Sequence, residues 1–252
     1  MKNKKTTIIT GGAGRIGQSL ARQLVEKKEN VLIGDFNKNK LNLIKKKINS
    51  KHLEIFHGDL TKIKNIDKFI KFGVSKFGKI NSAVHCSYPT SKGWGTKFEN
   101  LDEKYLYEDI QKQLGGTLIF SQRIIKYFLK IKEGNLILVS SIQGIQSPEF
   151  DHYNNLKMTS PIEYSATKAG VISITKYLSK YYRKKNIRIN CISPGGIEDN
   201  QPSLFKKRYK ISCNSKGLLS ADDISNSIRF LLSDESKYYN GQNLVIDDGW
   251  SL

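Results

Sequence analysis

The chain has 252 residues, of which 38% are hydrophobic and 26% charged, and it contains 20 Gly but only 5 Pro. This length suits one large domain or two small ones and is enough to bury a core. No window approaches the roughly 18 apolar residues that a membrane span needs, and the Lys-rich start runs into a predicted strand without an apolar signal core. We therefore expect a cytoplasmic protein with no membrane partner.

Basic residues outnumber acidic ones by 42 to 23, which gives a formal net charge of +19. Taken alone, this charge indicates a polyanionic partner such as nucleic acid, an acidic membrane surface or a phosphorylated substrate. Only seven of the basic residues are Arg, and short Lys-rich runs occur only at 45–47 and 206–210. Because dedicated phosphate and base readers favour the geometry of Arg, we interpret the charge as solvated surface and expect no nucleic-acid partner.

Short β-branched runs alternate with longer helical patterns along the whole chain. Helices are expected from about Arg15, after the second and third strands, over about 102–130, from near Tyr164 and over 222–232. The predicted strands are Thr6–Thr10, Val31–Asp35, Leu53–His57, Asn81–His85, Asn135–Val139, Arg188–Ile192 and Asn243–Ile246. This alternation is typical of the α/β class and predicts a Rossmann-type doubly wound sheet of seven mainly parallel strands with helices on both faces. No linker or repeat interrupts it, so we expect a single domain over residues 1–252.

Two connections, 142–163 and 195–217, are unusually long, and both follow a predicted strand. Loops of this length in an α/β domain are usually functional or disordered. Both leave carboxyl ends of strands, where open sheets bind ligands. We expect the first to be an insertion at the substrate pocket and the second to be a substrate lid.

A glycine-rich turn at 10–17 joins the first strand to the first helix, where glycines let the backbone approach a pyrophosphate. Asp35 ends the second strand, eighteen residues after Gly17, where its carboxylate can accept hydrogen bonds from the adenosine ribose. That carboxylate would repel a 2′-phosphate, which favours NAD over NADP. An ordinary turn aspartate remains the alternative, and Arg15 and Lys38 could weaken the preference by pairing with a phosphate.

Asp59 follows the third strand, at the sheet edge where an adenine ring would lie. Two interpretations stay open for it: an acceptor for the adenine amino group, or an N-cap of the following helix.

The three cysteines, Cys86, Cys191 and Cys213, lie far apart without Cys-x-x-Cys spacing. We therefore expect reduced thiols and no metal site.

Tyr164 and Lys168 open an apolar-periodic helix and stand one turn apart on the same face. We expect the ammonium group to lower the pKa of the tyrosine, which makes Tyr164 a candidate general acid/base. Ser141, after the fifth strand, can hydrogen-bond the same substrate oxygen while a nicotinamide exchanges hydride. A second Tyr-x-x-x-Lys, Tyr153 to Lys157, lies in a polar segment, so we favour Tyr164.

From residue 6 to the C-terminus the chain resembles a short-chain dehydrogenase/reductase of the small single-domain type. The glycine turn, Asp35, Asp59-Leu60, the Ser pair at 140–141, Tyr164 with Lys168, 188–195 and 241–250 agree in order and spacing. The resemblance implies that Lys168 also binds the nicotinamide ribose and that the Ile197 backbone holds the carboxamide. The cofactor residues it implies are Gly11, Arg15, Ile16, Gly17, Asp35, Asp59, Leu60, His85, Cys86, Ser87, Tyr164, Lys168, Pro194, Gly195 and Ile197.

The chain departs from the family pattern at several positions. Where the family has Asn-Asn-Ala-Gly, this chain has His85-Cys86-Ser87-Tyr88, and we interpret His85 as a strand-end residue near the cofactor rather than a catalytic base. The helical Asn of the usual catalytic tetrad is replaced by Gln113, whose amide offers the same donor and acceptor one methylene further out. The glycine spacing is more usual in the extended, nucleotide-sugar-modifying branch of the family.

Three segments, 88–89, 158–164 and 194–202, resemble a subgroup assigned to flagellin modification and surface amino-sugar biosynthesis, which implies a sugar or sugar-phosphate substrate. The basic segment Phe205–Lys210 is either a binding site for a phosphorylated sugar or a solvated helix face. We therefore expect an NAD-dependent oxidoreductase that interconverts a secondary alcohol and a ketone. The alternatives are a nucleotide-sugar epimerase or dehydratase that retains its NAD, and a non-catalytic binding or regulatory protein. The resemblance also implies a homo-tetramer or homo-dimer that pairs through the helices at 102–130 and 164–184.

Overall fold

The computed structural model describes residues 4–252, so the first three residues of the predicted domain lie outside the described residues. The strands are β1 (Thr6–Thr10), β2 (Asn30–Asp35), β3 (Leu53–His57), β4 (Ser82–His85), β5 (Gly134–Val139), β6 (Ile187–Pro194) and β7 (Asn243–Ile246). The helices are α1 (Arg15–Glu26), α2 (Lys38–Ile48), α3 (Ile63–Phe77), α4 (Glu103–Ile110), α5 (Gly116–Ile131), α6 (Ile162–Tyr181), α7 (Ser203–Ile211) and α8 (Ala221–Leu232). Within residues 4–252, no helix is both long and apolar enough to cross a membrane.

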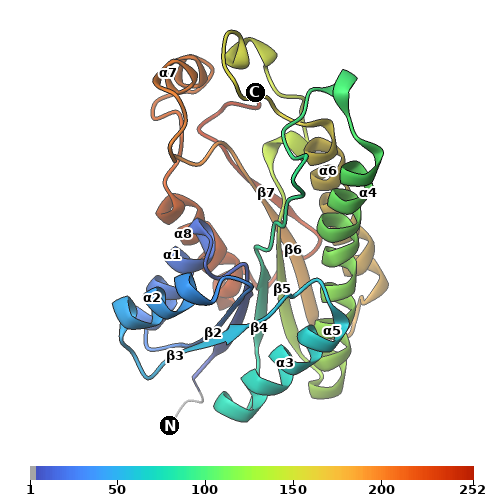
Figure 1. The fold of residues 1–252 in the computed structure, drawn as a ribbon. Coiled ribbons are helices and arrows are strands. Elements are labelled where there is room, and N and C mark those ends of the chain that lie inside the picture. The colour runs from blue at the N-terminus through green and yellow to red at the C-terminus, as the bar shows by residue number, and fades with distance from the viewer. Residues whose placement is uncertain (1–3) are drawn as a thin grey trace.

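The seven strands form one parallel sheet in the order β3-β2-β1-β4-β5-β6-β7. The order reverses direction between β1 and β4, which places the topological switch point of a doubly wound sheet there. The predicted fold class is thereby confirmed (Figure 1). All carboxyl ends lie at one edge, the edge that carries α7 and the C-terminus in the figure.

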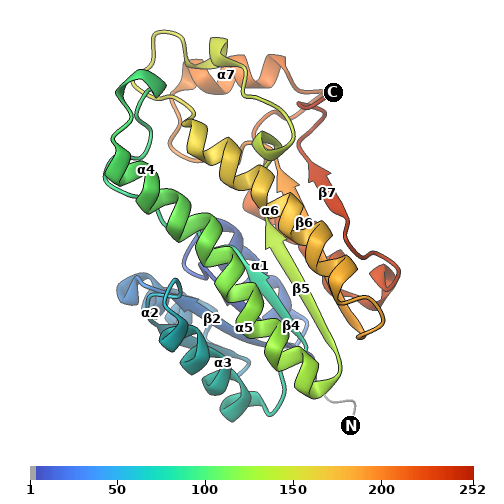
Figure 2. The same cartoon turned by 90° about the vertical axis from the view of Figure 1, so that its right-hand side faces the viewer.

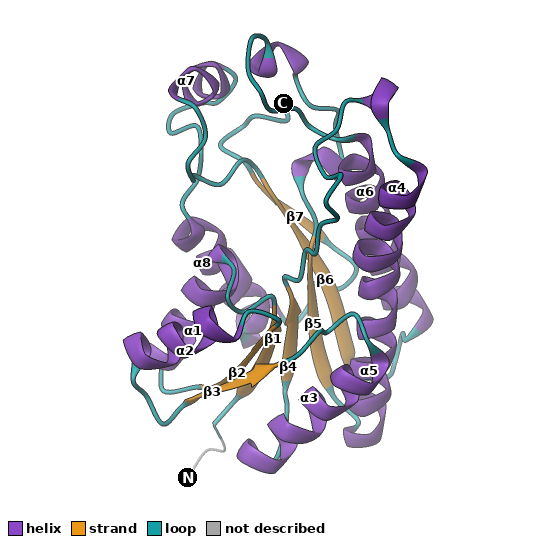
Figure 3. Cartoon of the chain, in the orientation of Figure 1, coloured by secondary structure: helices purple, strands orange, loops and turns teal. Residues whose placement is uncertain are grey.

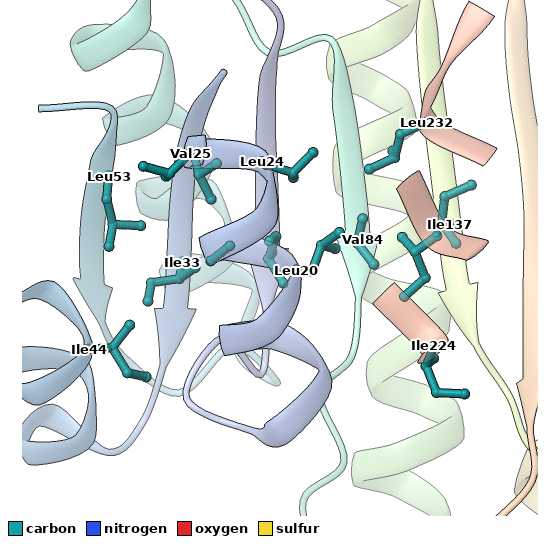
Figure 4. Close-up of a cluster of buried hydrophobic side chains, with 14 of the residues drawn as sticks. Leu20, Leu24, Val25, Ile33, Ile44, Leu53, Val84, Ile137, Ile224 and Leu232 are labelled. Atoms are coloured by element: carbon teal, nitrogen blue, oxygen red, sulfur yellow. The ribbon is translucent and has the colours of Figure 1, made fainter. Parts of the chain in front are cut away.

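Helices cover both faces of the sheet, α1, α2 and α8 on one side and α3, α5 and α6 on the other (Figure 3). Successive side chains of a strand point to opposite faces. In β1, Ile9 packs in the core with Leu20 and Leu24 of α1, whereas Ile8 packs with Phe69 of α3. Figure 4 shows the first of these cores, with Ile33, Val84 and Ile137 from the strands facing helix residues. These continuous apolar strands, buried on both faces, are typical of a parallel sheet.

The helix predicted over 102–130 is interrupted by a π-helical turn at Gln111–Gly115, which joins α4 to α5. Such turns occur frequently at functional sites. Figure 2 shows α4 and α5 running beside α6. The lid predicted over 195–217 contains a helix that the prediction did not specify, α7, and the insertion over 142–163 contains two short 3-10 helices, Ile142–Gly144 and Phe150–Tyr153.

Candidate active site

A groove of about 620 Å³ runs along the carboxyl edge of the sheet over β1, β2 and β4. Gly11 has φ +63°, and a Cβ there would lie 2.7 Å from the carbonyl oxygen of Cys86, so only glycine lets the turn pass the end of β4. Seven residues expected at the cofactor line this groove: Gly11, Arg15, Asp35, Asp59, Leu60, Cys86 and Ser87. Its size, its backbone turn at the start of α1 and its carboxylate fit a dinucleotide.

The carboxylate of Asp35 is held in place by the backbone. Its Oδ2 accepts from the amide of Ala13 (3.1 Å), and its Oδ1 accepts from the amide of Asn37 (2.9 Å). The side chain therefore ties the glycine turn to the end of β2 while it lines the groove.

Asp59 does not cap the following helix. Its Oδ1 accepts hydrogen bonds from the amide and the hydroxyl of Thr61. The helix α3 begins after Lys62 without a side-chain cap, so the N-cap interpretation is wrong.

A second cavity, of about 360 Å³, lies beside the groove and beneath α7. Arg15, Cys86 and Tyr88 line both spaces, so the two meet at these residues. Seven further residues predicted for the site line the cavity: Ile16, Ser141, Tyr164, Lys168, Pro194, Gly195 and Ile197. Most of the residues expected from sequence thus line one of two adjoining spaces, whereas Gly17 lines neither.

Tyr164 and Lys168 lie in the first turns of α6, whereas Lys157 is exposed in a loop, which supports the choice of Tyr164 over Tyr153. The Lys168 Nζ donates to the carbonyl of Val139 (2.9 Å), at the end of β5. It also lies 4.9 Å from the ring centroid of Tyr88 and 5.5 Å from that of Tyr164. A buried ammonium group is thus held by one carbonyl and two aromatic faces.

The electrostatics of Tyr164 differ from the expectation. Burial raises the pKa of Tyr164, and a hydrogen bond with the Ser141 side chain acts in the opposite direction. The expected lowering by Lys168 is therefore wrong: its ammonium group lies over the ring face, and loss of hydration dominates. The same burial lowers the pKa of Lys168 to about 8. The phenol is consequently a proton donor at neutral pH.

Gln113 and His85 lie next to the site but do not line either space. The Gln113 amide donates to the carbonyl of Pro89 (3.1 Å) and accepts from the hydroxyl of Thr167 (3.1 Å), so it joins the loop after β4 to α6. His85 stacks on Phe120 and shares a hydrogen bond with Thr10. Burial lowers the pKa of His85 to about 3, which makes it a neutral strand-end residue.

The lid contacts the cofactor turn through one ion pair, Arg15 with Asp199. Arg15 is thereby paired within the protein, and Lys38 does not line the groove. In α7, Lys206 pairs with Glu198, and Arg208 donates to the carbonyls of His152 and Asn154. Among the α7 residues, the cavity is lined by Phe205 and Tyr209, so the basic face of the helix points elsewhere.

Sequence reasoning missed the aromatic lining of the site. The rings of Tyr88, Trp94 and Tyr164 contact one another edge to face, with centroids 5.1 to 5.9 Å apart. His152, Tyr153 and Trp250 also line the cavity, from the insertion and from the C-terminal segment. Only the positions of these segments after strand ends indicated their role, because packing between distant segments leaves no local pattern.

Comparison with known proteins agrees with this geometry. A family model described as enoyl-(acyl carrier protein) reductase matches residues 11–251. A post-translational flagellin modification protein A of Campylobacter coli is 38% identical over the full length of both chains. A 7alpha-hydroxysteroid dehydrogenase of Bacteroides fragilis is 31% identical, with 98% of this chain and 95% of that protein covered. The chain therefore belongs to the short-chain dehydrogenase/reductase family, and it is an oxidoreductase of the kind that acts on CH-OH groups.

A solved structure supports the same assignment. The short-chain dehydrogenase from Leptospira borgpetersenii, with bound NAD+, superposes with a TM-score of 0.88 at 29% identity. The match covers 99% of this chain and 94% of that one. NAD(P) is accordingly the cofactor class of this chain.

The buried ammonium group predicts an unusual pH dependence of stability. The unfolded chain keeps the Lys168 proton up to a pKa near 10.5, but the folded protein loses it near 8. At pH 7 folding therefore carries the full cost of burying the charge, and this cost disappears as the pH rises from 8 to 10. Lys168→Met should raise the Tm at pH 7, and its advantage over the natural protein should shrink by pH 10.

Thermal unfolding followed by circular dichroism measures this difference. Lys176→Met, at an exposed position of the same helix, is the matched control and should show no such trend. A Lys168→Met variant less stable than the natural protein at pH 7 would mean that the carbonyl bond and the two ring contacts outweigh burial.

Proposed function

We propose that this protein is an NAD-dependent oxidoreductase that interconverts a secondary alcohol and a ketone on a sugar or sugar-phosphate. One observation carries the proposal: Ser141, Tyr164 and Lys168 line a cavity that adjoins a groove of dinucleotide size. A carbonyl group in the cavity would then lie beside both an acid and a hydride source.

The mechanism follows from the protonation states of these side chains. A bound nicotinamide supplies the hydride for reduction, or accepts it in oxidation. During reduction Tyr164 donates its phenolic proton to the substrate oxygen as the carbonyl carbon gains hydride, and the carbonyl π bond becomes the new O–H bond. The Ser141 hydroxyl holds the same oxygen, and the Lys168 ammonium group stabilises the phenolate that forms. Oxidation is the reverse, with phenolate accepting the proton.

The preference for NAD rests on Asp35. Backbone amides fix its carboxylate at the groove wall, where it would accept from ribose hydroxyls and repel a 2′-phosphate. Because Arg15 pairs with Asp199, it is not aligned to compensate for that repulsion. Lys40 also lines the groove and is the cation that would moderate the preference. The Leptospira relative with bound NAD+ supports the same choice.

Two observations support a sugar substrate: the sequence identity with a named relative, and the residues that line the cavity. A relative identical at 38% of positions is named a flagellin modification protein. The cavity is lined by aromatic rings and by the amides of Gln143 and Gln201, a mixture that suits a polyhydroxylated ring. We also infer that the protein is cytoplasmic. We infer one catalytic domain, with 142–163 and 195–217 as its substrate-binding insertion and lid.

The glycine spacing of the cofactor turn favours one second candidate, an epimerase or dehydratase that retains its cofactor. The two functions differ in their products. An oxidoreductase accumulates NADH when substrate and NAD+ are mixed, whereas the alternative returns each hydride to its product. A non-catalytic protein would do neither, although the catalytic residues Ser141, Tyr164 and Lys168 are all retained at the cavity.

We infer a homo-dimer or homo-tetramer that pairs through α4, α5 and α6, which run side by side (Figure 2). Large apolar side chains are exposed on these helices: Tyr107, Leu118, Ile162, Tyr177 and Tyr181. Ala166, Ala169 and Ser173 are exposed on α6, so they do not pack on the sheet. Small residues beside exposed apolar ones suit the close approach of a second copy.

Tyr164→Phe should lower kcat by about 10²- to 10⁴-fold, because it removes the proposed proton donor. The affinity for NADH should stay within about twofold, since the groove is unchanged. Tyr238→Phe, which removes a phenol at an exposed position outside the cavity, is the control and should retain full activity. Absorbance at 340 nm and nicotinamide fluorescence measure the two quantities. Near-normal turnover by Tyr164→Phe would refute the proposed acid.

Asp35→Ser should weaken NADH binding about tenfold and strengthen NADPH binding, because it removes an ionised acceptor and a repulsive charge. Nicotinamide fluorescence titrations give both dissociation constants. Asp59→Ser, in the same groove, should affect the two cofactors equally. Equal changes in the dissociation constants of NADH and NADPH for Asp35→Ser would mean that Asp35 does not bind the adenosine ribose.

Ala169→Arg should shift the protein towards monomer, since it places a long charged side chain on the inferred contact face. Light scattering coupled to size-exclusion chromatography measures the mass across micromolar concentrations. Ser75→Arg, at an exposed position of α3, should leave the oligomer intact. A natural protein that elutes as a monomer throughout this range would contradict the inferred assembly.

A further inference from the structure

The segment after β4 places one aromatic ring against both Tyr164 and Lys168, the proposed catalytic pair. Tyr88 lies three residues beyond the end of β4. Its ring centroid is 4.9 Å from the Lys168 Nζ and 5.2 Å from the ring centroid of Tyr164, with the two ring planes 72° apart. Tyr88 lines both the groove and the cavity, whereas the catalytic pair lines only the cavity. The Tyr88 ring therefore stands between the catalytic pair and the groove.

This ring is held in place from α4 and from the π-helical turn that follows it. The buried carboxylate of Asp109, in α4, accepts from the amide (2.6 Å) and the hydroxyl (2.7 Å) of Ser91. In the π-helical turn, the buried Gln113 amide donates to the carbonyl of Pro89, the residue next to Tyr88 (3.1 Å). The same amide accepts a hydrogen bond from α6. It therefore ties the segment that carries Tyr88 to the helix that carries the catalytic pair.

The ring of Tyr88, rather than its hydroxyl group, makes the contacts with the catalytic pair. The hydroxyl oxygen is buried and has no hydrogen-bond partner among residues 4–252. Burial raises the pKa of Tyr88, and negative charge on Tyr164, Asp109 or Glu163 acts in the same direction, so the phenol stays neutral. An aromatic face attracts a cation with or without a hydroxyl group. Phenylalanine at position 88 would therefore keep these contacts.

The ring acts on the Lys168 ammonium group in two opposed ways. Its face attracts the cation, which favours the charged form, and its bulk keeps water away, which disfavours that form. Because burial lowers the pKa of Lys168 to about 8 in spite of the ring contacts, the exclusion of water dominates. Burial also raises the pKa of the Cys86 thiol to about 12 and lowers that of His85 to about 3, so both groups are neutral where Lys168 titrates.

We infer that Tyr88 is a positioning residue: its ring fixes the Lys168 ammonium group beside the Tyr164 phenol and shields it from water on the groove side. The attraction between this cation and a phenolate grows as water is excluded, because the local dielectric constant falls. The inference rests on the proposed function, in which the phenolate forms during reduction. It also gives the buried Gln113 a part, since that amide anchors the segment of Tyr88 instead of touching the reacting atoms.

A titration of Lys168 tests the shielding without any substrate. In protein that contains carbon-13 lysine, the Cε–Hε signal that Lys168→Met lacks belongs to Lys168, and its chemical shift follows protonation. The midpoint should lie near pH 8 in the natural protein and in Tyr88→Phe. Tyr88→Ala admits water and should raise the midpoint by about one pH unit or more. Tyr88→Leu keeps an apolar group but removes the ring face, so its midpoint should fall below that of Tyr88→Phe.

Tyr238→Ala, which removes a ring at an exposed position, is the control and should leave the midpoint unchanged. A midpoint in Tyr88→Ala equal to that of the natural protein would overturn the inference. If Tyr88→Ala does not fold, equal midpoints in Tyr88→Leu and Tyr88→Phe would overturn it instead.

Kinetics separate this inference from the proposed function. With NADH and scyllo-inosose, a polyhydroxylated ring ketone, kcat should fall above about pH 8 as Lys168 loses its proton. In Tyr88→Ala this fall should move to higher pH together with the midpoint, whereas a merely structural loss would lower kcat equally at every pH. A midpoint that moves without the fall in kcat would show that the ring does not act on proton transfer. If the natural protein does not reduce scyllo-inosose, the proposed reaction fails, and the titration still decides whether the Tyr88 ring shields Lys168.

Discussion

All seven strands run in one direction, and this constraint assembles the site. Each carboxyl end lies at the same edge, so the loops after β1, β4, β5 and β6 must converge there. The switch point between β1 and β4 opens the dinucleotide groove, and the long loops after β5 and β6 enclose the cavity beside it. Residues distant in sequence become neighbours because the loops that carry them all begin at the same edge of the sheet.

The site also carries a cost in folding free energy, the burial of the Lys168 ammonium group, which the proposed function explains. Lys168 is buried with its pKa lowered to about 8, and among residues 4–252 its ammonium group contacts the Val139 carbonyl and two aromatic rings. Burial of an apolar side chain at this position would cost less free energy. A cation beside Tyr164, however, stabilises the phenolate that appears during proton transfer. The unfavourable buried charge of Lys168 thus lies where the proposed chemistry needs a cation.

Sequence reasoning predicted the features that local pattern controls. Alternating runs defined the strands, and the helix expected from near Tyr164 is present as α6, whereas Lys157 lies in a loop. It could not predict side-chain contacts between distant segments. The stacking of Trp250 on Tyr209 is one example, and the effect of burial on Tyr164 is another. Both depend on three-dimensional packing, which no single stretch of sequence encodes.

A crystal structure of the protein with NAD+ tests the central claim most directly, namely that groove and cavity form one reaction site. The account predicts the adenosine ribose on Asp35 and the nicotinamide ring at the junction by Cys86 and Tyr88, with its reactive carbon facing the Tyr164 hydroxyl across the cavity mouth. A nicotinamide ring turned away from Tyr164, or excluded from the junction by the Tyr88 side chain, would contradict it.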